Sequence, residues 1–494
     1  MSQLSANSKG ASDEMKTGSI PRRKALAKAI SFKNYVSLGL GDIIGIGWVI
    51  VAGDWLLKGG PLGAILAFII GGVLLIAVGK CYAELTPAIP VAGGEVAFSY
   101  KAFGTGPAFL TAWFLAFGYI FVCPFETISL GWLLENIVPA VKSPPLYSLG
   151  GYEVSLSSLI PGLAFALLII GINYRSVKNT AIFQTFFMAA MLVCVVAFTA
   201  VALIKGDFSN MQPLFSRSGS LLAAPLSIIA VIGMVPFFMS GFDTIPQAAE
   251  ESGNKVNPRD LGKAIIIAII VGIIFYVVVI LALSICYPWQ ESVKLEMPTA
   301  QVFRIAFGYE WASKLVLIAA FFGLITTLNA TFLAASRVVF SMGRGGLLPK
   351  WFGEVSDKNR TPKNAILFVG FLTIIGSFVG KSFLLPIVTV SSLGFACAWF
   401  FTCYAAVALR KTAPDMQRPY RVKHKSTLYI GVVISGILII LMVFPGSPAQ
   451  ISWPLEYFIL AAWIFFGYIA YRWRMRAKDL TKDERDYQIL GEYR

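Results

Sequence analysis

The chain has 494 residues, of which 57% are hydrophobic and only 14% are charged. A soluble globular protein usually carries about 25% charged residues, and the apolar excess here is gathered in long runs such as residues 264–286. A run of that length crosses a hydrocarbon core about 30 Å thick. The composition therefore excludes a soluble globular fold and predicts an all-α, multi-pass membrane protein.

Several kinds of chemistry are excluded by residue counts alone. The chain has one histidine, His424, so a Ser-His-Asp triad, a multi-histidine zinc site and a bis-histidine haem site are not expected. Its six cysteines form no CxxC pair, and no GxxxxGK[ST] loop for ATP is present. We therefore expect neither an enzyme nor a bound metal or cofactor.

Apolar runs between charged or Pro/Gly-rich breaks predict about twelve membrane spans. The third and eighth are longer than a bilayer requires, and an even number places both termini on one side. The predicted spans are 34–57, 61–86, 105–138, 156–173, 179–204, 223–248, 262–287, 302–336, 364–380, 384–409, 427–445 and 453–472.

Basic residues predict which side holds the termini. With both termini inside, 33 of the 41 Lys and Arg residues fall on the cytoplasmic side, which is the bias expected of cytoplasmic loops. The net charge of +15 is then a topology signal with some attraction to anionic lipid, and it requires no nucleic-acid partner. We expect a cell-membrane protein with a disordered cytoplasmic tail over 1–32 and a second cytoplasmic tail over 473–494.

Two spans contain helix-weakening sequence at mid-membrane. The first carries four glycines within residues 39–47, and the sixth carries Gly241 between Pro236 and Pro246. Each glycine costs a helix about 1 kcal/mol relative to alanine, and proline costs about 3 kcal/mol. Irregular backbone at membrane depth survives where it lines a cavity or is buried in protein. Tight glycine packing with a proline kink is the alternative, but each break also holds a carboxylate, Asp42 or Asp243.

The spacing of five spans between the two breaks is typical of an inverted-repeat transporter. A half-helix that starts at Ile46, Gly47 and Trp48 offers N–H groups to a carboxylate. Free carbonyl groups around Phe237 to Ser240 offer oxygen to an ammonium group. The pair of breaks therefore suits a small zwitterion such as an amino acid.

A series of short motifs resembles the signature of the amino acid–polyamine–organocation (APC) permeases. The motifs are GIG (45–47), YAEL (82–85), IPVAGGE (89–95), AFG (102–104), GFD (241–243), AEE (249–251), LNA (328–330) and GGLLP (345–349). The resemblance implies a LeuT-type core of two inverted five-helix repeats, over 33–204 and 223–410, followed by two accessory helices over 427–472. It also implies a secondary transporter for a small-molecule amino acid or amine, for which we expect symport.

The chain departs from the APC pattern at two positions. Asp42 stands where the family usually has a small or neutral residue, and Met191 stands where some proton-coupled members have a lysine in place of sodium. The hydroxyls of Thr326 and Thr327 are candidate sodium ligands, although threonine in a membrane helix often bonds its own backbone. We expect proton coupling and leave sodium open.

Candidate site residues combine the breaks, the intramembrane acids and the family positions. An ionisable group inside the bilayer is a functional candidate because its burial costs at least about 2.5–3.5 kcal/mol. Phe237 matches a position where an aromatic ring covers the substrate, while Glu84 and Glu95 suit a salt-bridged gate. Predicted substrate-binding residues are Asp42, Gly45, Ile46, Gly47, Trp48, Glu126, Phe237, Ser240 and Gly241, and predicted coupling or gating residues are Glu84, Asp243, Thr326 and Thr327.

Structural roles are open alternatives for several of these residues. Asp243 could cap a half-helix, Asp42 could contact only a neighbouring helix, and Glu126 suits the cavity and a structural role equally. Amino acid versus polyamine, symport versus exchange, and the oligomeric state are also undecided by the sequence. An ion channel would need a filter or pore helix, which the sequence does not contain.

Overall fold

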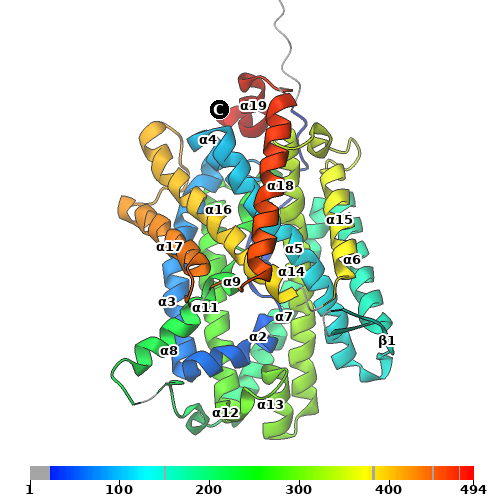
Figure 1. The fold of residues 1–494 in the computed structure, drawn as a ribbon, viewed down its shortest axis with the longest axis vertical. Helices are drawn as coiled ribbons and strands as arrows, with labels where there is room; N and C mark the ends of the chain where they lie inside the picture. The colour runs from blue at the N-terminus through cyan, green and yellow to red at the C-terminus, as the bar shows by residue number, and fades with distance from the viewer. Residues whose placement is uncertain (1–22, 150–151, 218, 381–383, 448–449, 478) are drawn as a thin grey trace, which may run out of the picture.

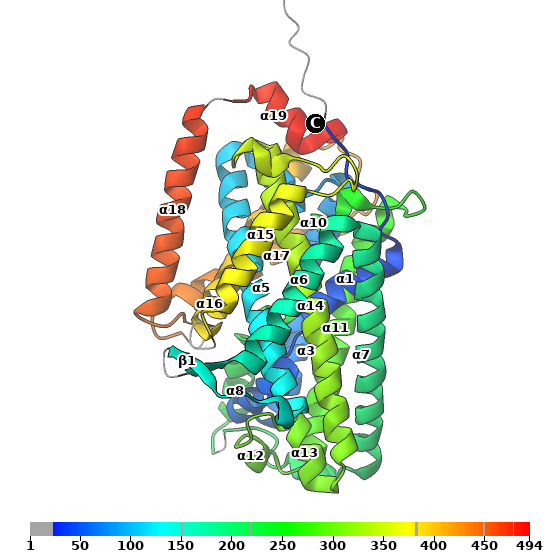
Figure 2. The same cartoon turned by 90° about the vertical axis from the view of Figure 1, so that its right-hand side faces the viewer.

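The structure is a computed structural model that describes residues 23–149, 152–217, 219–380, 384–447, 450–477 and 479–494. It confirms the all-α fold class: the described part of the chain holds long helices and a single two-stranded hairpin. Most helices run along the long axis of the molecule (Figures 1 and 2). We call the end that carries α19 (Lys482–Leu490) the terminal end, and the end that carries α12 (Trp289–Ser292) the opposite end.

The first half of the chain forms the helices on either side of the first break. They are α1 (Phe32–Ile43), α2 (Gly47–Ile50), α3 (Ala52–Ala88), α4 (Gly94–Phe103), α5 (Thr105–Ile137), α6 (Leu156–Arg175) and α7 (Val177–Lys205). The 3-10 turn η1 (Pro139–Val141) and the antiparallel strands β1 (Pro145–Leu149) and β2 (Tyr152–Ser155) connect α5 to α6.

The second half begins, after the 3-10 turn η2 (Phe208–Met211), with a span in three pieces. These pieces are α8 (Ala223–Ile232), α9 (Val235–Met239) and α10 (Thr244–Gln247), followed by the 3-10 turn η3 (Ala249–Glu251). The remaining elements are α11 (Pro258–Cys286), α12, α13 (Pro298–Phe307), α14 (Glu310–Arg344), η4 (Lys350–Gly353), α15 (Lys363–Ser377), α16 (Leu384–Thr412), α17 (Lys425–Val443), α18 (Leu455–Ala477), α19 and η6 (Gly491–Tyr493).

Helical segments occupy all twelve predicted ranges. Among the described residues, nine helices are long and apolar enough to cross a membrane. The first and sixth predicted spans are outside that count because they are broken, and the ninth is outside it because α15 has only 15 residues. The expected gap between the first two spans is a kink inside α3, where Gly60 has a φ of +69°.

The structure adds detail to three of the predicted segments. The eighth span begins at Glu310 rather than 302, because Gly308 adopts a left-handed conformation, with a φ of +66°, and ends the separate helix α13. Within the predicted 1–32 tail, residues 23–31 are packed on the protein, and Leu26 and Ile30 are buried; residues 1–22 lie outside the described part. The predicted 473–494 tail contains α19, whose Ile489 and Leu490 are buried.

Burial separates a protein-facing core from lipid-facing helix surfaces. Helix α5 packs between α14 and α16, and α3 packs along α11, so these helices form the centre of the bundle. On α7 the side chains of Val193, Val196 and Ile204 are instead about 70% exposed. Large apolar side chains at that exposure are unfavourable in water and suit a helix that faces hydrocarbon.

Candidate functional site

The two broken spans cross each other at their breaks. Gly241 has a φ of +127°, and a Cβ atom built on it would lie 2.6 Å from the Ile43 nitrogen and 2.7 Å from the Asp42 carbonyl carbon. A side chain at this position would therefore collide with the backbone of the first break, and the backbone conformation itself favours glycine. Gly241 thus fixes how closely the two breaks approach, but it does not line the cavity described below.

Side chains from other helices satisfy the carbonyl groups that the first break exposes. The Tyr276 hydroxyl on α11 donates a hydrogen bond of 2.8 Å to the Ile43 carbonyl oxygen. The Thr327 hydroxyl on α14 donates to the Gly41 carbonyl oxygen at 3.0 Å. Because unpaired backbone groups are costly at membrane depth, these contacts explain how α1 can end at Ile43 inside the bundle.

The second break satisfies its own backbone locally. The Ser240 hydroxyl donates to the Phe237 carbonyl oxygen at 2.7 Å, so one of the oxygens that we expected to face an ammonium group already has a donor. Asp243 accepts a hydrogen bond of 3.0 Å from the Gly241 N–H and one of 2.8 Å from the Trp399 indole on α16. Asp243 is fully buried beneath the break and lies outside the cavity.

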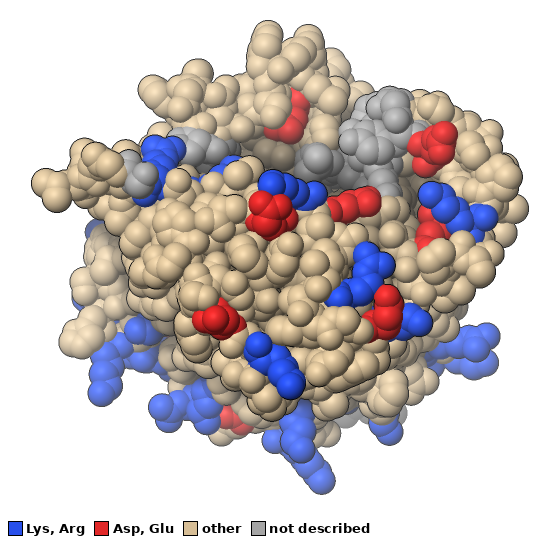
Figure 3. All heavy atoms as spheres, turned by 90° about the horizontal axis from the view of Figure 1, so that it is seen from below, with Lys and Arg blue, Asp and Glu red and all other residues tan. Residues whose placement is uncertain are grey.

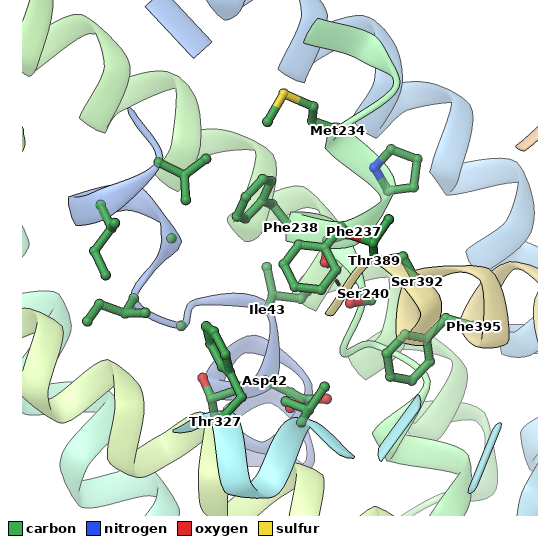
Figure 4. Close-up of a pocket in the computed structure, with 18 of the residues that line it drawn as sticks. Asp42, Ile43, Met234, Phe237, Phe238, Ser240, Thr327, Thr389, Ser392 and Phe395 are labelled. Carbon is green, nitrogen blue, oxygen red and sulfur yellow. Dashed lines mark hydrogen bonds between the residues drawn. The ribbon is translucent and has the colours of Figure 1, made fainter. Parts of the chain in front are cut away.

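A cavity of about 610 Å³ lies against both breaks. Figure 4 shows Asp42, Phe237, Ser240 and Thr327 around it, from three segments of the chain. Its volume is within the range of small-molecule sites, about 300–1,000 Å³. Predicted site residues in its wall are Asp42, Gly45, Ile46, Gly47, Glu126, Phe237, Ser240 and Thr327.

The cavity opens toward the opposite end of the molecule. Its lining includes Asp54, Lys58 and Glu296, whose side chains are exposed. Viewed from below, this end carries acidic and basic side chains interspersed among uncharged residues (Figure 3). The cavity therefore communicates with solvent on the face that lies away from α19.

Trp48 was predicted to line the substrate pocket, but in the structure it lies outside the cavity wall. Its ring is fully buried, stacked on Phe198 with centroids 5.5 Å apart, and edge-on to Phe275. The side chain therefore packs behind the break and does not line the cavity. The expectation that Trp48 shapes the substrate pocket is corrected accordingly.

Phe238 takes a place in the wall that the sequence analysis missed. The rings of Phe237 and Phe238 lie side by side in Figure 4, with centroids 5.1 Å apart. A Cβ atom built on Gly47 would lie 2.8 Å from Cδ1 of Phe238 and closer still to its neighbour Cε1. Gly47 therefore provides the room for the Phe238 ring. The sequence alone does not indicate which of the two adjacent phenylalanines contacts Gly47.

Two carboxylates face the cavity without a cationic partner. Asp42 is half-buried and accepts a hydrogen bond from the Thr331 hydroxyl, while the buried Glu126 has one oxygen, Oε2, with no hydrogen bond. Within the described part of the chain, neither acid forms an ion pair. A carboxylate held away from water needs a cation or a proton nearby, so the wall attracts positive charge.

The two threonines predicted as sodium ligands lie beside Gly323 and the end of α1. The Met191 sulfur lies 3.3 Å, and the Ile44 carbonyl oxygen 3.1 Å, from a Cβ atom built on Gly323. The Thr326 hydroxyl donates to the Gly323 carbonyl oxygen at 2.8 Å. Both predicted sodium-ligand threonines thus donate to backbone carbonyls, and only Thr327 reaches the cavity wall.

The terminal end is closed by buried ion pairs. Arg337 on α14 binds Glu251 of η3 at 2.8 Å with both side chains fully buried, and Arg344 binds Glu250 at 2.8 Å. Arg23 adds a second cation to Glu250, also at 2.8 Å. Burial alone would raise the pKa of Glu250, but Arg344 and Arg23 lower it to about 2.

The two acids predicted to form a salt-bridged gate behave differently. Glu84 is ion-paired with Arg410 at the terminal end of α16 and also accepts a hydrogen bond from the Val422 N–H at 2.8 Å. It therefore holds the loop before α17 and lies away from the cavity. Glu95 is buried and bonded to the Gln247 amide; among the described residues it has no basic partner, so its expected salt bridge is corrected.

Comparison with known proteins gives a family match and several relatives. The sequence model described as amino acid permease matches residues 30–466. The chain is 26% identical to the branched-chain amino acid permease BcaP of Bacillus subtilis, over 81% of this chain and 84% of that protein. It is 27% identical to the methylthioribose transporter of Bacillus subtilis, over 91% and 94%, and 26% identical to the chloroplastic cationic amino acid transporter 6 of Arabidopsis thaliana, over 82% and 70%.

Proposed function

This chain belongs to the amino acid permease family, and from that membership we propose that it carries an amino acid or related organic amine across the cell membrane. The transport is secondary active symport with protons, by alternating access. The observation that carries the proposal is the cavity of about 610 Å³ between the two breaks, with Asp42 and Glu126 in its wall.

The substrate class follows from the charge of the cavity. Four acidic residues and one basic residue, Lys58, contribute to the lining, and the acids nearest the breaks are Asp42 and Glu126. An ammonium group between these two carboxylates would provide the positive charge that they lack. The remaining wall is mostly apolar, with Phe237 and Phe238 suited to cover an aliphatic chain. We therefore favour an amino acid with a basic side chain, and a polyamine is the alternative from the same chemistry.

The difference between the two ends, one closed by ion pairs and one open to the cavity, supports an alternating-access cycle. Arg23, the C-terminal helix α19 and the ion pairs of Glu250 and Glu251 lie at one end. We assign this end to the cytoplasm because the sequence places the basic residues there by the positive-inside rule. The cavity opens at the other end, so this conformation faces outward. Inward opening requires η3 and α10 to separate from Arg337 and Arg344.

Proton coupling is favoured over sodium coupling by the region around Met191. The Thr326 and Thr327 hydroxyls both donate to backbone carbonyl oxygens, and α7 carries no lysine near Met191 that could replace an ion. A carboxylate is then the group that can exchange a proton, and Asp243 is the candidate from sequence. Asp243→Asn is expected to flatten the pH dependence of transport while substrate binding persists.

A thermal-shift screen of the purified protein tests the substrate class. Lysine, arginine, ornithine and putrescine are compared with leucine, glutamate and methylthioribose, each at a matched concentration. A ligand that binds the folded state raises the melting temperature by mass action. We expect the basic amino acids to give the largest shifts; stabilisation by leucine or glutamate alone would contradict a cationic substrate.

A further inference from the structure

A second group of buried polar side chains lies between the cavity and the terminal end. It consists of Tyr82 on α3, Glu95 on α4, Tyr119 on α5, Asp243 beneath the second break, and Gln247 on α10, all fully buried. We call these residues the inner cluster. The Gln247 amide donates to the Glu95 carboxylate and, at 3.3 Å, to the Asp243 backbone carbonyl oxygen, so it joins α4 to the second break.

The inner cluster contains two carboxyl groups and no cation. Among the basic residues on the elements around it, Arg337 is paired with Glu251, Arg344 with Glu250, and Arg410 with Glu84. Lys101 on α4 and Arg485 on α19 donate to backbone carbonyl oxygens, of Tyr493 and Gly345 respectively. On the neighbouring α19, Asp486 accepts a hydrogen bond from Tyr100. Two buried carboxylates close together without a cation cannot both remain ionised, so the cluster holds a proton.

Hydrogen bonding indicates which carboxyl group holds it. Both oxygens of Asp243 accept hydrogen bonds, from the Gly241 N–H at 3.0 Å and the Trp399 indole at 2.8 Å, which stabilises the ionised form. Glu95 accepts a bond only from Gln247, and its other oxygen, Oε1, is buried without a partner in the described part of the chain. Burial and the nearby Asp243 raise the pKa of Glu95.

The cluster also has a link to the cavity. Trp399 lines the cavity wall and binds Asp243. The Tyr119 hydroxyl lies against Asp243 and the Tyr82 hydroxyl lies against Glu95, yet neither reaches hydrogen-bond geometry with a described residue. Each hydroxyl can therefore accept one proton and donate another after a small shift.

The closed terminal end seals Glu95 from water. The Gly93 N–H donates to the Gln247 carbonyl oxygen at 3.2 Å, and a Cβ atom built on Gly94 would lie 2.5 Å from Cβ of Pro246. The start of α4 is thus in direct contact with α10. Movement of α10 during inward opening would withdraw Gln247 and admit water to Glu95.

We propose that Glu95 is the site at which the coupled proton binds, an inference that rests on the proposed function. From the outward cavity, a proton joins the Asp243 carboxylate and passes through the Tyr119 and Tyr82 hydroxyls. Each hydroxyl takes one proton and gives up one, and an O–H bond forms on Glu95. After α10 separates from α4, that bond breaks and the proton passes to cytoplasmic water, leaving the Glu95 carboxylate to be protonated in the next cycle.

The test uses the full-length protein in liposomes with an internal pH dye and labelled lysine. Proton entry and lysine entry are measured in the same vesicles, and exchange of labelled for unlabelled lysine is measured separately. Glu95→Gln keeps the shape of the protonated acid, so we expect it to retain exchange while proton entry per lysine falls by about tenfold or more. Glu456→Gln, the same change at a buried acid on α18, is the control and keeps the wild-type ratio.

The outcomes separate this inference from the proposed function. Wild-type vesicles that take up no lysine or other amine would refute the transport proposal, and uptake without protons would refute its coupling. A wild-type ratio of protons to lysine in Glu95→Gln would overturn the assignment of Glu95 alone. If Glu95→Gln does not fold, Glu95→Asp should retain coupling with an altered pH profile, and an unaltered profile would also overturn the assignment.

Discussion

Asp42 is the residue that we expect to contribute most to substrate specificity. It lies on the last turn of α1, and its carboxylate faces the cavity with only the Thr331 hydroxyl as a described donor. A carboxylate so placed is stabilised by a cation in the cavity and is costly when the cavity holds none. The identity of residue 42 therefore bears directly on which substrates bind.

Asp42→Asn is predicted to weaken binding of a basic amino acid by about 2 kcal/mol or more, or roughly 30-fold. The loss arises because the substrate ammonium group would lose its partner carboxylate. Asp54→Asn, at the exposed outer end of the cavity, should change affinity little because water screens that charge. Titration calorimetry on both variants measures the difference. Equal affinities for every ligand in the panel would show that Asp42 has only a structural role.

Substitution by alanine is predicted to change the stability of the protein very differently at two glycines of the breaks. Gly241→Ala should strongly destabilise the protein, since the new Cβ atom would collide with the backbone at Asp42 and Ile43. Gly45→Ala should be tolerated, because the nearest atom to its Cβ would be the Thr327 hydroxyl oxygen at an ordinary 3.4 Å. Thermal unfolding in detergent reports both effects. A Gly241→Ala protein as stable as Gly45→Ala would contradict the close crossing of the two breaks.

At the scale of elements, η3 and α14 are held together by charge rather than by apolar packing alone. Glu250 and Glu251 project from η3 to Arg344 and Arg337 on α14, and all four side chains are buried. Truncating one partner of such a pair leaves the other charge buried and unpaired, which costs several kcal/mol. The ion pairs therefore favour the conformation in which the terminal end is closed.

The Glu250 ion pairs are predicted to be insensitive to pH across the physiological range. The folded-state pKa of Glu250 is about 2, below the unfolded value of about 4.3. A depressed carboxyl pKa contributes stability above pH 4.3 that is lost as the pH falls toward 2. Thiol labelling of Ser341→Cys, near Arg344, is divided at each pH by the labelling of the unfolded protein, because only the thiolate reacts. This ratio should be the same at pH 5 and pH 8, and a higher ratio at pH 5 would contradict the prediction.

The C-terminal helix α19 is predicted to stabilise the closed terminal end. Arg485 on α19 donates to the Gly345 carbonyl oxygen at 3.1 Å, while Arg23 donates to the Gln488 carbonyl oxygen at 3.2 Å. The helix thus joins the end of α14 to the residues before α1. Removal of residues 479–494 should lower the melting temperature and increase labelling of Ser341→Cys. A truncated protein identical to the full chain in both measurements would exclude this role.

At the scale of the whole molecule, hydropathy predicted where helices lie, and glycine, proline and carboxylates together predicted where two of them break. Contacts between distant segments could not be predicted. The pairing of Arg337 with Glu251, the packing of Trp48 behind the break and the position of Phe238 beside Gly47 depend on how helices rotate against each other. No periodicity in a single sequence reports that rotation.

The sequence also did not predict the β1–β2 hairpin or the packing of residues 23–31 against the protein. The hairpin lies between spans, where Pro144, Pro145 and the serines around it favour a loop. Residues 23–31 resemble a polar tail, yet Leu26 and Ile30 are buried and the Ala29 N–H bonds the Glu251 carbonyl oxygen at 2.9 Å. Burial of two side chains in nine residues is too sparse a pattern to recognise in advance.

Counterflow in liposomes tests the central claim, that the cavity between the breaks carries a cationic amine across the membrane. Vesicles containing the full-length protein are loaded with unlabelled lysine and diluted into a trace of labelled lysine. A carrier exchanges the two, so label should accumulate transiently inside wild-type vesicles and far less in Asp42→Asn vesicles. Label that never exceeds its outside concentration with lysine, arginine, ornithine or putrescine would contradict the account.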